Sequence, residues 1–432
     1  MRNTSLKASP GRAESFEDLV AAGPGTPAGR YLRCFWQPVY HCADIRPGEA
    51  KPLRIMSESF TLYRGESGAL HLVAPFCPHR GLRLSAGHVE SDALRCLYHG
   101  WKFDHDGRCL EQPAEDKPFA QRIRIRSYPV REYLGLVFAF LGEGEAPEFP
   151  RYPEFEHFDG MLEVDSYRRD CNYFQNIDNA LDHCHLQFVH SEVAKVALND
   201  VVMAGSIKVE ESEWGLSMTF TRKDGQLFIS QFGMPNMIQV AALPVDAEMG
   251  WKESLFWWVP IDDDWHMQFG INTVRATGEA ARRISEKRQA RRREIDQPHQ
   301  RVAEDVIAGR IRLREVDPKR CDLVKLQDDV AQVGQMRIVD RGLEHLGSTD
   351  IGVVKIRRLW RRELQAMAEG RAPRRWNKPA SLRPSVWGFG ATPVNPGQAK
   401  AQIVDVRPFV EIDLQMEALG ERLAPPGLAG RR

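Results

Sequence analysis

The chain has 432 residues, of which 42% are hydrophobic and 27% are charged, and this length allows roughly two to three domains with buried cores. Its 59 basic residues balance its 59 acidic residues, so the charge gives no reason to expect nucleic acid or an anionic membrane as a partner. Because the N-terminus lacks the apolar segment of a secretory signal and the longest apolar stretch, residues 134–141, is too short to span a bilayer, we expect a cytoplasmic protein.

Residues 34–150 are rich in predicted strands, separated by turn signals such as Gly-Glu-Ser-Gly and His-Asp-Gly. This texture is typical of a small, mostly antiparallel β domain. The apolar runs are residues 59–65, 70–76, 93–104 and 134–142. The proline-rich segment 143–153 marks the expected end of this domain. The N-terminal segment 1–33 is expected to pack on the second domain, residues 151–432.

Two short segments of the β region each offer one thiolate and one imidazole. Cys77 and His79 lie in Cys-Pro-His-Arg-Gly, and Cys96 and His99 lie in Cys-Leu-Tyr-His-Gly-Trp. A 2Fe–2S cluster held by two cysteines on one iron and two histidines on the other needs this ligand set. A structural zinc site uses the same residue types but usually keeps its cysteines together and its histidines together. The mixed pairs therefore favour the iron–sulfur cluster over zinc.

Residues 151–432 are expected to form a second, α+β domain. Helices are predicted at 171–190, 279–314 and 322–367. The second of them contains the basic run 282–293, which is expected to be a solvated helix face. A docking surface for an acidic redox partner is the alternative interpretation of this run. Between the first two helices the sequence predicts an antiparallel sheet. Its strands are residues 206–212, 216–222, 226–232, 237–244, 254–261 and 267–274.

The predicted helix at 171–190 carries a second candidate metal site. On a regular helix Asn179, Asp182 and His185 step by three and lie along one face. His190 falls off that face, so both histidines can bind one metal only if the helix bulges or ends between them. Two imidazoles and one carboxylate form the facial triad of non-haem Fe(II) oxygenases. A hydrogen-bonded structural cluster is the alternative interpretation of these residues.

Both constellations together resemble one family. The first resembles the cluster-binding pattern of Rieske proteins, and Asn-x2-Asp-x2-His-x4-His at 179–190 resembles the motif of ring-hydroxylating oxygenase α subunits. The resemblance implies that His185 and His190 bind a mononuclear iron. It also implies that the carboxylate of Asp182 orients His185 and bridges electron transfer from His79 or His99 of a neighbouring subunit, with Asn179 as a further catalytic residue.

The third iron ligand must come from elsewhere in the chain. Residues 326–330, Leu-Gln-Asp-Asp-Val, resemble the phthalate-dioxygenase-like branch of the family, in which the aspartate after Glu or Gln completes the triad. This points to Asp328, with Asp329 as the competing choice. His183 lies off the motif and is not expected to be a ligand.

The resemblance implies the terminal oxygenase component of a multicomponent system, with a Rieske 2Fe–2S cluster and a mononuclear Fe(II) as cofactors and O2 as cosubstrate. It implies a helix-grip catalytic domain over 151–432 and a homo-oligomer of trimers or stacked trimers. No flavin- or nicotinamide-binding motif is evident in the chain, so the NAD(P)H-dependent reductase is expected to be a separate protein.

The substrate is expected to be a small aromatic molecule, with or without a carboxylate, that is hydroxylated or oxidatively O-demethylated. Phthalate-type members bind carboxylates with arginines on the catalytic sheet, and the candidate strand at 228–238 has none, which argues against phthalate itself. Apolar side chains suited to an aromatic ligand, or else to the core, are Phe188, Phe232, Met234, Met237 and Trp257. Demethylation or hydroxylation of a quaternary amine such as a betaine is the alternative, and it would need an aromatic cage.

Overall fold

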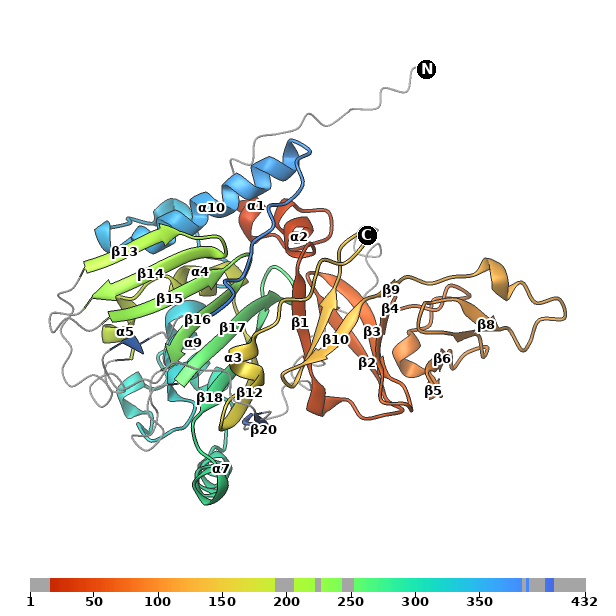
Figure 1. Ribbon diagram of the computed structural model, residues 1–432, viewed down its shortest axis with the longest axis horizontal. Coiled ribbons are helices and arrows are strands. Elements are labelled where there is room, and N and C mark those ends of the chain that lie inside the picture. The colour runs from red at the N-terminus through yellow and green to blue at the C-terminus, as the bar shows by residue number, and fades with distance from the viewer. Residues whose placement is uncertain are drawn as a thin grey trace.

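The computed structural model describes residues 16–190, 206–221, 227–242, 252–382, 386–387 and 401–407 (Figure 1). Its elements form a region of small β sheets at one end and a large sheet with helices at the other. The fold class predicted from the sequence, an all-β region followed by an antiparallel sheet with long helices, is confirmed. The domain limits at residues 34, 150 and 151 stay a prediction, and residues 1–15 of the N-terminal segment lie outside the described residues.

The β region contains three small antiparallel sheets. The first has the order β1 (Trp36–His41), β11 (Leu136–Phe140), β10 (Val130–Tyr133). The second has the order β2 (Ala50–Ile55), β3 (Glu58–Arg64), β4 (Leu70–Val73), β9 (Ser127–Tyr128). The third has the order β5 (His88–Glu90), β6 (Ala93–Arg95), β7 (Lys102–Phe103), β8 (Cys109–Glu111). One cysteine–histidine segment precedes β5 and the other connects β6 to β7.

The large sheet has nine strands, and its neighbours are antiparallel except at the edge where β20 runs parallel to β12. The order is β13 (Ser206–Glu211), β14 (Gly215–Thr221), β15 (Leu227–Gly233), β16 (Met237–Ala242), β17 (Lys252–Pro260), β18 (His266–Val274), β12 (Met161–Arg169), β20 (Gln402–Asp405), with β19 (Val386–Trp387) paired to β15. The six predicted strands correspond to β13–β18. Strand β12 was not predicted, because charged side chains alternate along it and no apolar run marks it.

Helices surround this sheet, and three of the predicted helical stretches are interrupted. The stretch at 279–314 is two helices that separate before Pro298, and the stretch at 322–367 is two helices joined by residues 334–350. The stretch at 171–190 breaks after Ala180. The helices are α1 (Glu17–Val20), α2 (Pro27–Leu32), α3 (Pro153–Glu156), α4 (Tyr173–Ala180), α5 (His185–Phe188), α7 (Gly278–Arg293), α8 (His299–Ile307), α9 (Leu323–Val333) and α10 (Ile351–Ala368).

One hydrophobic core joins the β region to the large sheet. Phe138 of β11 packs edge-on against Trp257 of β17, with ring centroids 5.7 Å apart. Backbone N–H groups of Met56 and Ser57 donate to the carbonyl oxygens of Pro260 and Ile261, both at 2.8 Å. These contacts fix the position of one region on the other. Among the described residues, no helix combines the length and the apolar character that crossing a membrane requires.

A glycine in the first turn of α10 holds this helix close to the turn after α4. Gly352 is buried, and a Cβ at this position would collide with the carbonyl oxygen of Leu181. Because that contact is to backbone, Gly352→Ala is expected to lower the free energy of unfolding by about 1–3 kcal/mol. The measurement is the midpoint of thermal unfolding. Gly25→Ala is the matched control, since a Cβ at Gly25 meets nothing within 4 Å, and an unchanged midpoint in Gly352→Ala would contradict the prediction.

Candidate functional site

The two cysteine–histidine segments fold into a pair of similar loops. In each, the cysteine N–H donates to the carbonyl oxygen five residues later, Leu82 or Trp101, at 2.8 Å. The glycine N–H four residues after each cysteine donates back to the cysteine carbonyl oxygen, at 2.9 and 3.1 Å. Gly81 and Gly100 have φ of 76° and 72°, a left-handed conformation that glycine adopts without strain. Each loop therefore depends on its glycine for the tight turn that places the histidine beside the cysteine.

The four side chains of these loops converge. Cys77 and Cys96 are buried together, and burial, followed by the proximity of Cys96, raises the pKa of the Cys77 thiol to about 11. The rings of His79 and His99 have centroids 4.4 Å apart, and Nδ1 of His79 is buried with no hydrogen-bond partner among the described residues. Two neighbouring thiols and two imidazoles, one with an unused ring nitrogen, are the donor set of a mixed-ligand 2Fe–2S cluster. The residues fit that group.

The chain between α4 and α5 is a turn and not part of the single helix predicted over 171–190. Helix α4 ends at Ala180, and an Asp182 carboxylate oxygen caps the next turn by accepting from the N–H of Cys184 at 2.8 Å. Asn179, Asp182 and His185 therefore do not share one helix face. A first break separates α4 from His185, and α5 then ends at Phe188, between the two histidines, as a shared metal requires. These breaks let α5 and the turn after it present His185 and His190 to the same point, where their ring centroids are 5.4 Å apart.

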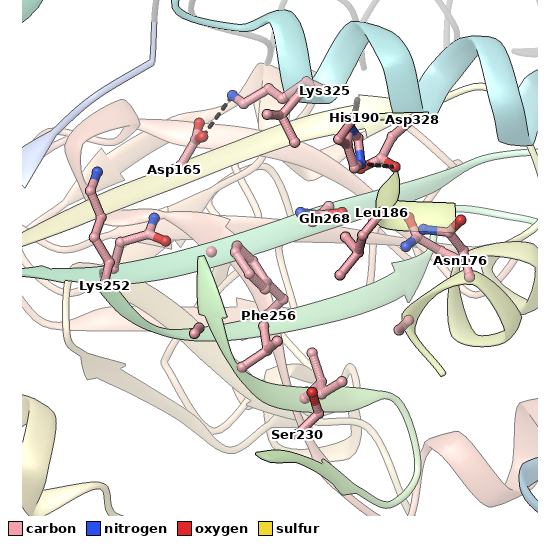
Figure 2. A pocket seen from close by; sticks show the side chains of 18 of the residues that line it. Asp165, Asn176, Leu186, His190, Ser230, Lys252, Phe256, Gln268, Lys325 and Asp328 are labelled. Atoms are coloured by element: carbon pink, nitrogen blue, oxygen red, sulfur yellow. Dashed lines mark ion pairs between the residues drawn. The ribbon is translucent and has the colours of Figure 1, made fainter. Parts of the chain in front are cut away.

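Asp328 of α9 joins these two histidines. Ligand atoms of His185, His190 and Asp328 all lie within 4.8 Å of one another. Nε2 of His190 is 3.3 Å from Oδ1 of Asp328, a contact that Figure 2 shows. Nδ1 of His190 is bound by Oε1 of Gln327 at 2.9 Å, which leaves Nε2 for a metal. Two imidazoles and a carboxylate at this spacing fit a facial iron triad.

The neighbouring carboxylate is turned away from the triad. Oδ1 of Asp329 accepts from Nε of Arg169 at 2.7 Å, and Oδ2 lies 3.4 Å from Nε2 of His299. Burial, only partly offset by Arg169, raises the pKa of Asp329 to about 7. Burial also acts on Asp328, but hydrogen bonding to His190 and the charge of Arg169 lower its pKa to about 2. The geometry and the charge both favour Asp328 as the residue that could hold a metal.

Asp182 and Asn179 both contact the ring of His185, but the atoms that make these contacts could not be predicted from the motif. The backbone carbonyl of Asp182, rather than its carboxylate, contacts Nδ1 of His185. The tautomer role expected of the carboxylate therefore falls to the backbone. Nδ2 of Asn179 is 3.5 Å from Nε2 of His185. His183 is buried, is absent from the triad and lies edge-on to Phe220 at 5.9 Å, while burial and then His185 lower its pKa to about 4.

A cavity of about 310 Å³ opens from the triad over the face of the large sheet (Figure 2). Its middle is apolar, with Leu186 and Phe256 between the triad and the far end. The far end is charged and carries Lys252 and the ion pair of Asp165 with Lys325. A cavity of this size with few polar groups is what a small organic ligand occupies.

The five apolar residues predicted to form the pocket do not line this cavity. Phe188 is 80% exposed, and Phe232, Met234, Met237 and Trp257 belong to the hydrophobic core. Successive side chains of a strand point to opposite faces, so Trp257 faces the core while its neighbours Phe256 and Trp258 face the cavity. The prediction chose the wrong alternation because the sequence of a strand buried on both faces does not reveal which face is hollow.

The charged residues of the cavity were not predicted from the sequence either. Glu163 and Asp165 are on the unpredicted strand β12, and Lys252 begins β17. Arg288 lies in the basic run of α7 that was expected to be solvated, yet its side chain is only 21% exposed and lines the cavity. Alternating acidic residues at 163 and 165 are the one signal in the sequence that could have revealed a strand with a polar face.

Comparison with known proteins matches both parts of the chain. Residues 35–130 match the family model "Rieske [2Fe-2S] domain", and residues 169–249 match "Vanillate O-demethylase oxygenase C-terminal domain". The chain is 30% identical over 377 residues to the 5,5'-dehydrodivanillate O-demethylase oxygenase subunit of Sphingobium sp. (strain NBRC 103272 / SYK-6), covering 84% of this chain and 82% of the relative.

Two further proteins extend this similarity. The oxygenase subunit of the tert-butanol monooxygenase / tert-amyl alcohol desaturase of Aquincola tertiaricarbonis is 31% identical over 392 residues, covering 82% of this chain and 77% of the relative. The solved terminal oxygenase of carbazole 1,9a-dioxygenase from Nocardioides aromaticivorans IC177 superposes with a TM-score of 0.57 at 18% identity, covering 79% of this chain and all of that one. The latter likeness shows the shared fold.

The triad makes a prediction about iron content. Asp328→Asn is expected to lose the mononuclear iron and to keep the 2Fe–2S cluster, because it removes the only anionic ligand of the triad. Asp329→Asn keeps an acceptor for Arg169, so it should weaken iron binding by no more than the roughly 10- to 100-fold typical of an outer partner. Iron per chain after dialysis against Fe(II), with cluster absorbance as internal control, measures both. Iron retained in Asp328→Asn and lost in Asp329→Asn would reverse the assignment.

Proposed function

This chain belongs to the oxygenase subunits of the Rieske non-haem iron oxygenases, and we propose that it hydroxylates or oxidatively O-demethylates a small aromatic substrate. As a member of this family it is an oxidoreductase that carries a Rieske 2Fe–2S cluster and a mononuclear iron, and it works in a multicomponent system with a separate reductase. The observation that carries the proposal is the triad of His185, His190 and Asp328 at the end of an apolar cavity.

Each part of the site has a role in this proposal. When bound, the mononuclear iron supplies O2 activation and the cluster supplies electrons. Gln327 and the backbone carbonyl of Asp182 fix the ring orientations of the two histidines, as partners of metal-binding imidazoles do. Leu186 and Phe256 cover the middle of the cavity, where they exclude water and hold the substrate ring next to the triad.

An aromatic substrate is supported by the cavity more than by the relatives. One relative is named for O-demethylation of dehydrodivanillate and another for oxidation of tert-butanol, so membership of the family leaves the substrate class open. Five aromatic side chains of the large sheet line the cavity: Tyr167, Phe220, Phe228, Phe256 and Trp258. Rings of this kind pack best against another ring, offset or edge-on.

The quaternary-amine alternative finds no support. A cationic ligand would need an aromatic cage without competing positive charge. This cavity is lined by Lys252, Arg288 and Lys325, which repel a cation. The relatives compared above are not named for amines either.

The arrangement of the metal sites supports an oligomer. The loops that carry Cys77 and Cys96 lie with β5–β8 at one end of the molecule, and α5 and α9 lie towards the other end (Figure 1). An electron leaving the cluster would therefore have to cross the width of its own chain. We infer that the cluster of one subunit serves the iron of a neighbour in a homotrimer or stacked trimers, with the half-buried Asp182 at the contact.

Oxygen uptake tests the proposed reaction. With NADH and a surrogate reductase, the protein is expected to consume O2 when given methoxybenzoates or a longer methoxylated aromatic acid, and formaldehyde or a hydroxylated ring should accumulate in proportion. Betaine and the protein without Fe(II) are the negative controls. Uptake stimulated by betaine and not by any aromatic compound would contradict the proposal.

The Asp182 bridge gives a second prediction. Asp182→Asn can still accept from the N–H of Cys184 but loses the negative charge that would bind a histidine N–H across the subunit contact. It should retain both metals while turnover falls by at least about 100-fold, the lower range for a positioned proton-transfer or hydrogen-bonding group. Asp159→Asn, at an exposed position, is the matched control. Cluster reoxidation after single-turnover mixing with O2 measures the effect, and a wild-type rate would exclude the bridge.

A further inference from the structure

The end of the cavity away from the triad is built from buried ion pairs. Nζ of Lys252 is 2.8 Å from one carboxylate oxygen of Glu163, and Nη1 of Arg288 is 2.9 Å from the other. Lys325 and Asp165 form a second pair, at 2.6 Å. Figure 2 shows Lys252 on the side of the cavity opposite the contact of His190 with Asp328, and the pair of Asp165 with Lys325 lies between the two. One carboxylate thus spans two cations that come from a strand and a helix.

The burial of these charges needs a reason. Lys252 is only 5% exposed, and burial, together with Arg288, lowers its pKa although Glu163 acts in the opposite direction. Replacing a buried ion pair by apolar residues is often neutral or stabilising, so stability alone does not explain charges at a cavity wall. A charged group there does contribute specificity for a ligand that carries the opposite charge.

The balance of charge at this wall is positive among the described residues. Three cations line it, namely Lys252, Arg288 and Lys325, and two carboxylates face them, namely Glu163 and Asp165. A third carboxylate of the wall, Asp322, is paired with Arg320 at 2.9 Å. Oδ1 of Asp165 is buried without a hydrogen-bond partner in the described part of the chain, so this wall also leaves an acceptor for a hydroxyl of the ligand.

The sheet sets the distance between the triad and the part of this wall formed by Glu163, Lys252 and Arg288. Glu163 and Tyr167 are four residues apart on β12, which corresponds to ~13 Å at about 3.3 Å per residue. The hydroxyl of Tyr167 accepts from Arg169, which in turn lies 3.7 Å from Asp328. Between Glu163 and the triad, the ring of Phe256 lies over Gly270, whose missing Cβ leaves room for the ring. A single benzene ring with its substituents is shorter than this span.

We propose that Lys252 and Arg288 bind a carboxylate of the substrate, which is an aromatic acid of about two rings whose acidic end lies remote from the oxidised group. Glu163 already shows how a carboxylate spans these two cations, and the ligand carboxylate joins them from the cavity side. The ring nearest the carboxylate packs on Phe256, and the far ring reaches the triad. This inference rests on the proposed function for its aromatic substrate, but the carboxylate site can be tested by binding alone, without turnover.

Binding measured without electrons tests it. Calorimetry on the isolated oxygenase compares 4′-methoxybiphenyl-4-carboxylate with its neutral carboxamide and with the shorter 4-methoxybenzoate. The biphenyl acid should bind at least ~10-fold more tightly than the carboxamide, because a charged hydrogen bond contributes about that factor. It should bind at least ~10-fold more tightly than the shorter acid, because its second ring buries additional apolar surface. Lys252→Met should weaken binding of the acid roughly 10- to 100-fold and leave the carboxamide nearly unchanged. Glu163 keeps Arg288 as its partner in this variant.

The controls separate a lost subsite from a lost fold. Lys208→Met makes the same substitution at a 68% exposed lysine of β13 on the same sheet, and it should keep the wild-type preference. Cluster absorbance and thermal unfolding report folding, and if Lys252→Met does not fold, Arg288→Met carries the test. Equal affinity for acid and carboxamide, or a preference that survives both substitutions, would overturn the carboxylate site. Equal affinity for the shorter acid would overturn the length. A protein that binds the biphenyl acid as expected but consumes no O2 would instead contradict the proposed function.

Discussion

The buried guanidinium of Arg169 is the interaction on which the mononuclear site depends. Arg169 ends β12 and has no exposed surface. It donates to Asp329 of α9 at 2.7 Å, to the hydroxyl of Tyr167 at 3.2 Å and to Asn176 of α4, and it lies 3.7 Å from Asp328. A buried charge is tolerated only when it is paired and hydrogen-bonded. Strand β12 and helices α4 and α9 are thereby held in one arrangement, so the carboxylate of the triad is in place before any metal binds.

The groups around Arg169 extend this arrangement without adding charge. Nε2 of His266 contacts Oδ1 of Asn176 at 3.0 Å, and Nε2 of His299 lies 3.4 Å from Asp329. Burial lowers the pKa of His266 to about 3 and that of His299 well below its usual value, so both imidazoles are neutral at physiological pH. The positive charge of Arg169 is balanced by carboxylates alone. A protonated histidine here would compete with Arg169 for Asp329 and loosen α9.

The sequence was informative where function depends on residues that are close in the chain. The two loops of the cluster, and the pair His185 and His190, are local motifs whose spacing is set by the metal. Asp328 could be predicted because its motif is short. The choice between Asp328 and Asp329 could not be made from the sequence, because it depends on the tertiary contact of Asp329 with Arg169. The break after Ala180 was not readable, because it is made by a side chain, Asp182, that caps a turn instead of continuing the helix.

The cavity was the least predictable part, for a physical reason. Residues 255–259 are apolar at every position, since one face of β17 packs on the core and the other lines the cavity, and alternation carries no signal when both sides are apolar. The charged wall of the cavity could not be predicted for another reason. Lys252, Arg288 and Lys325 lie far apart in the sequence, and each is an ordinary surface residue by composition. Only the pairing of β12 with β18 and of β18 with β17 brings Glu163 close to Lys252.

The two ends of the cavity share the elements that hold them. Lys325 and Asp328 are three residues apart on α9, a rise of ~4.5 Å, so one helix places a cation of the charged wall and the carboxylate of the triad on neighbouring turns. Arg169 fixes α9 to β12, and β12 carries Glu163 and Asp165. The separation of the ends is therefore set by a helix and a strand rather than by loops. Substitutions at the far end of β12 or at the start of β17 can change which substrate fits while the triad keeps its geometry, because Arg169, at the opposite end of β12, fixes α9 through Asp329.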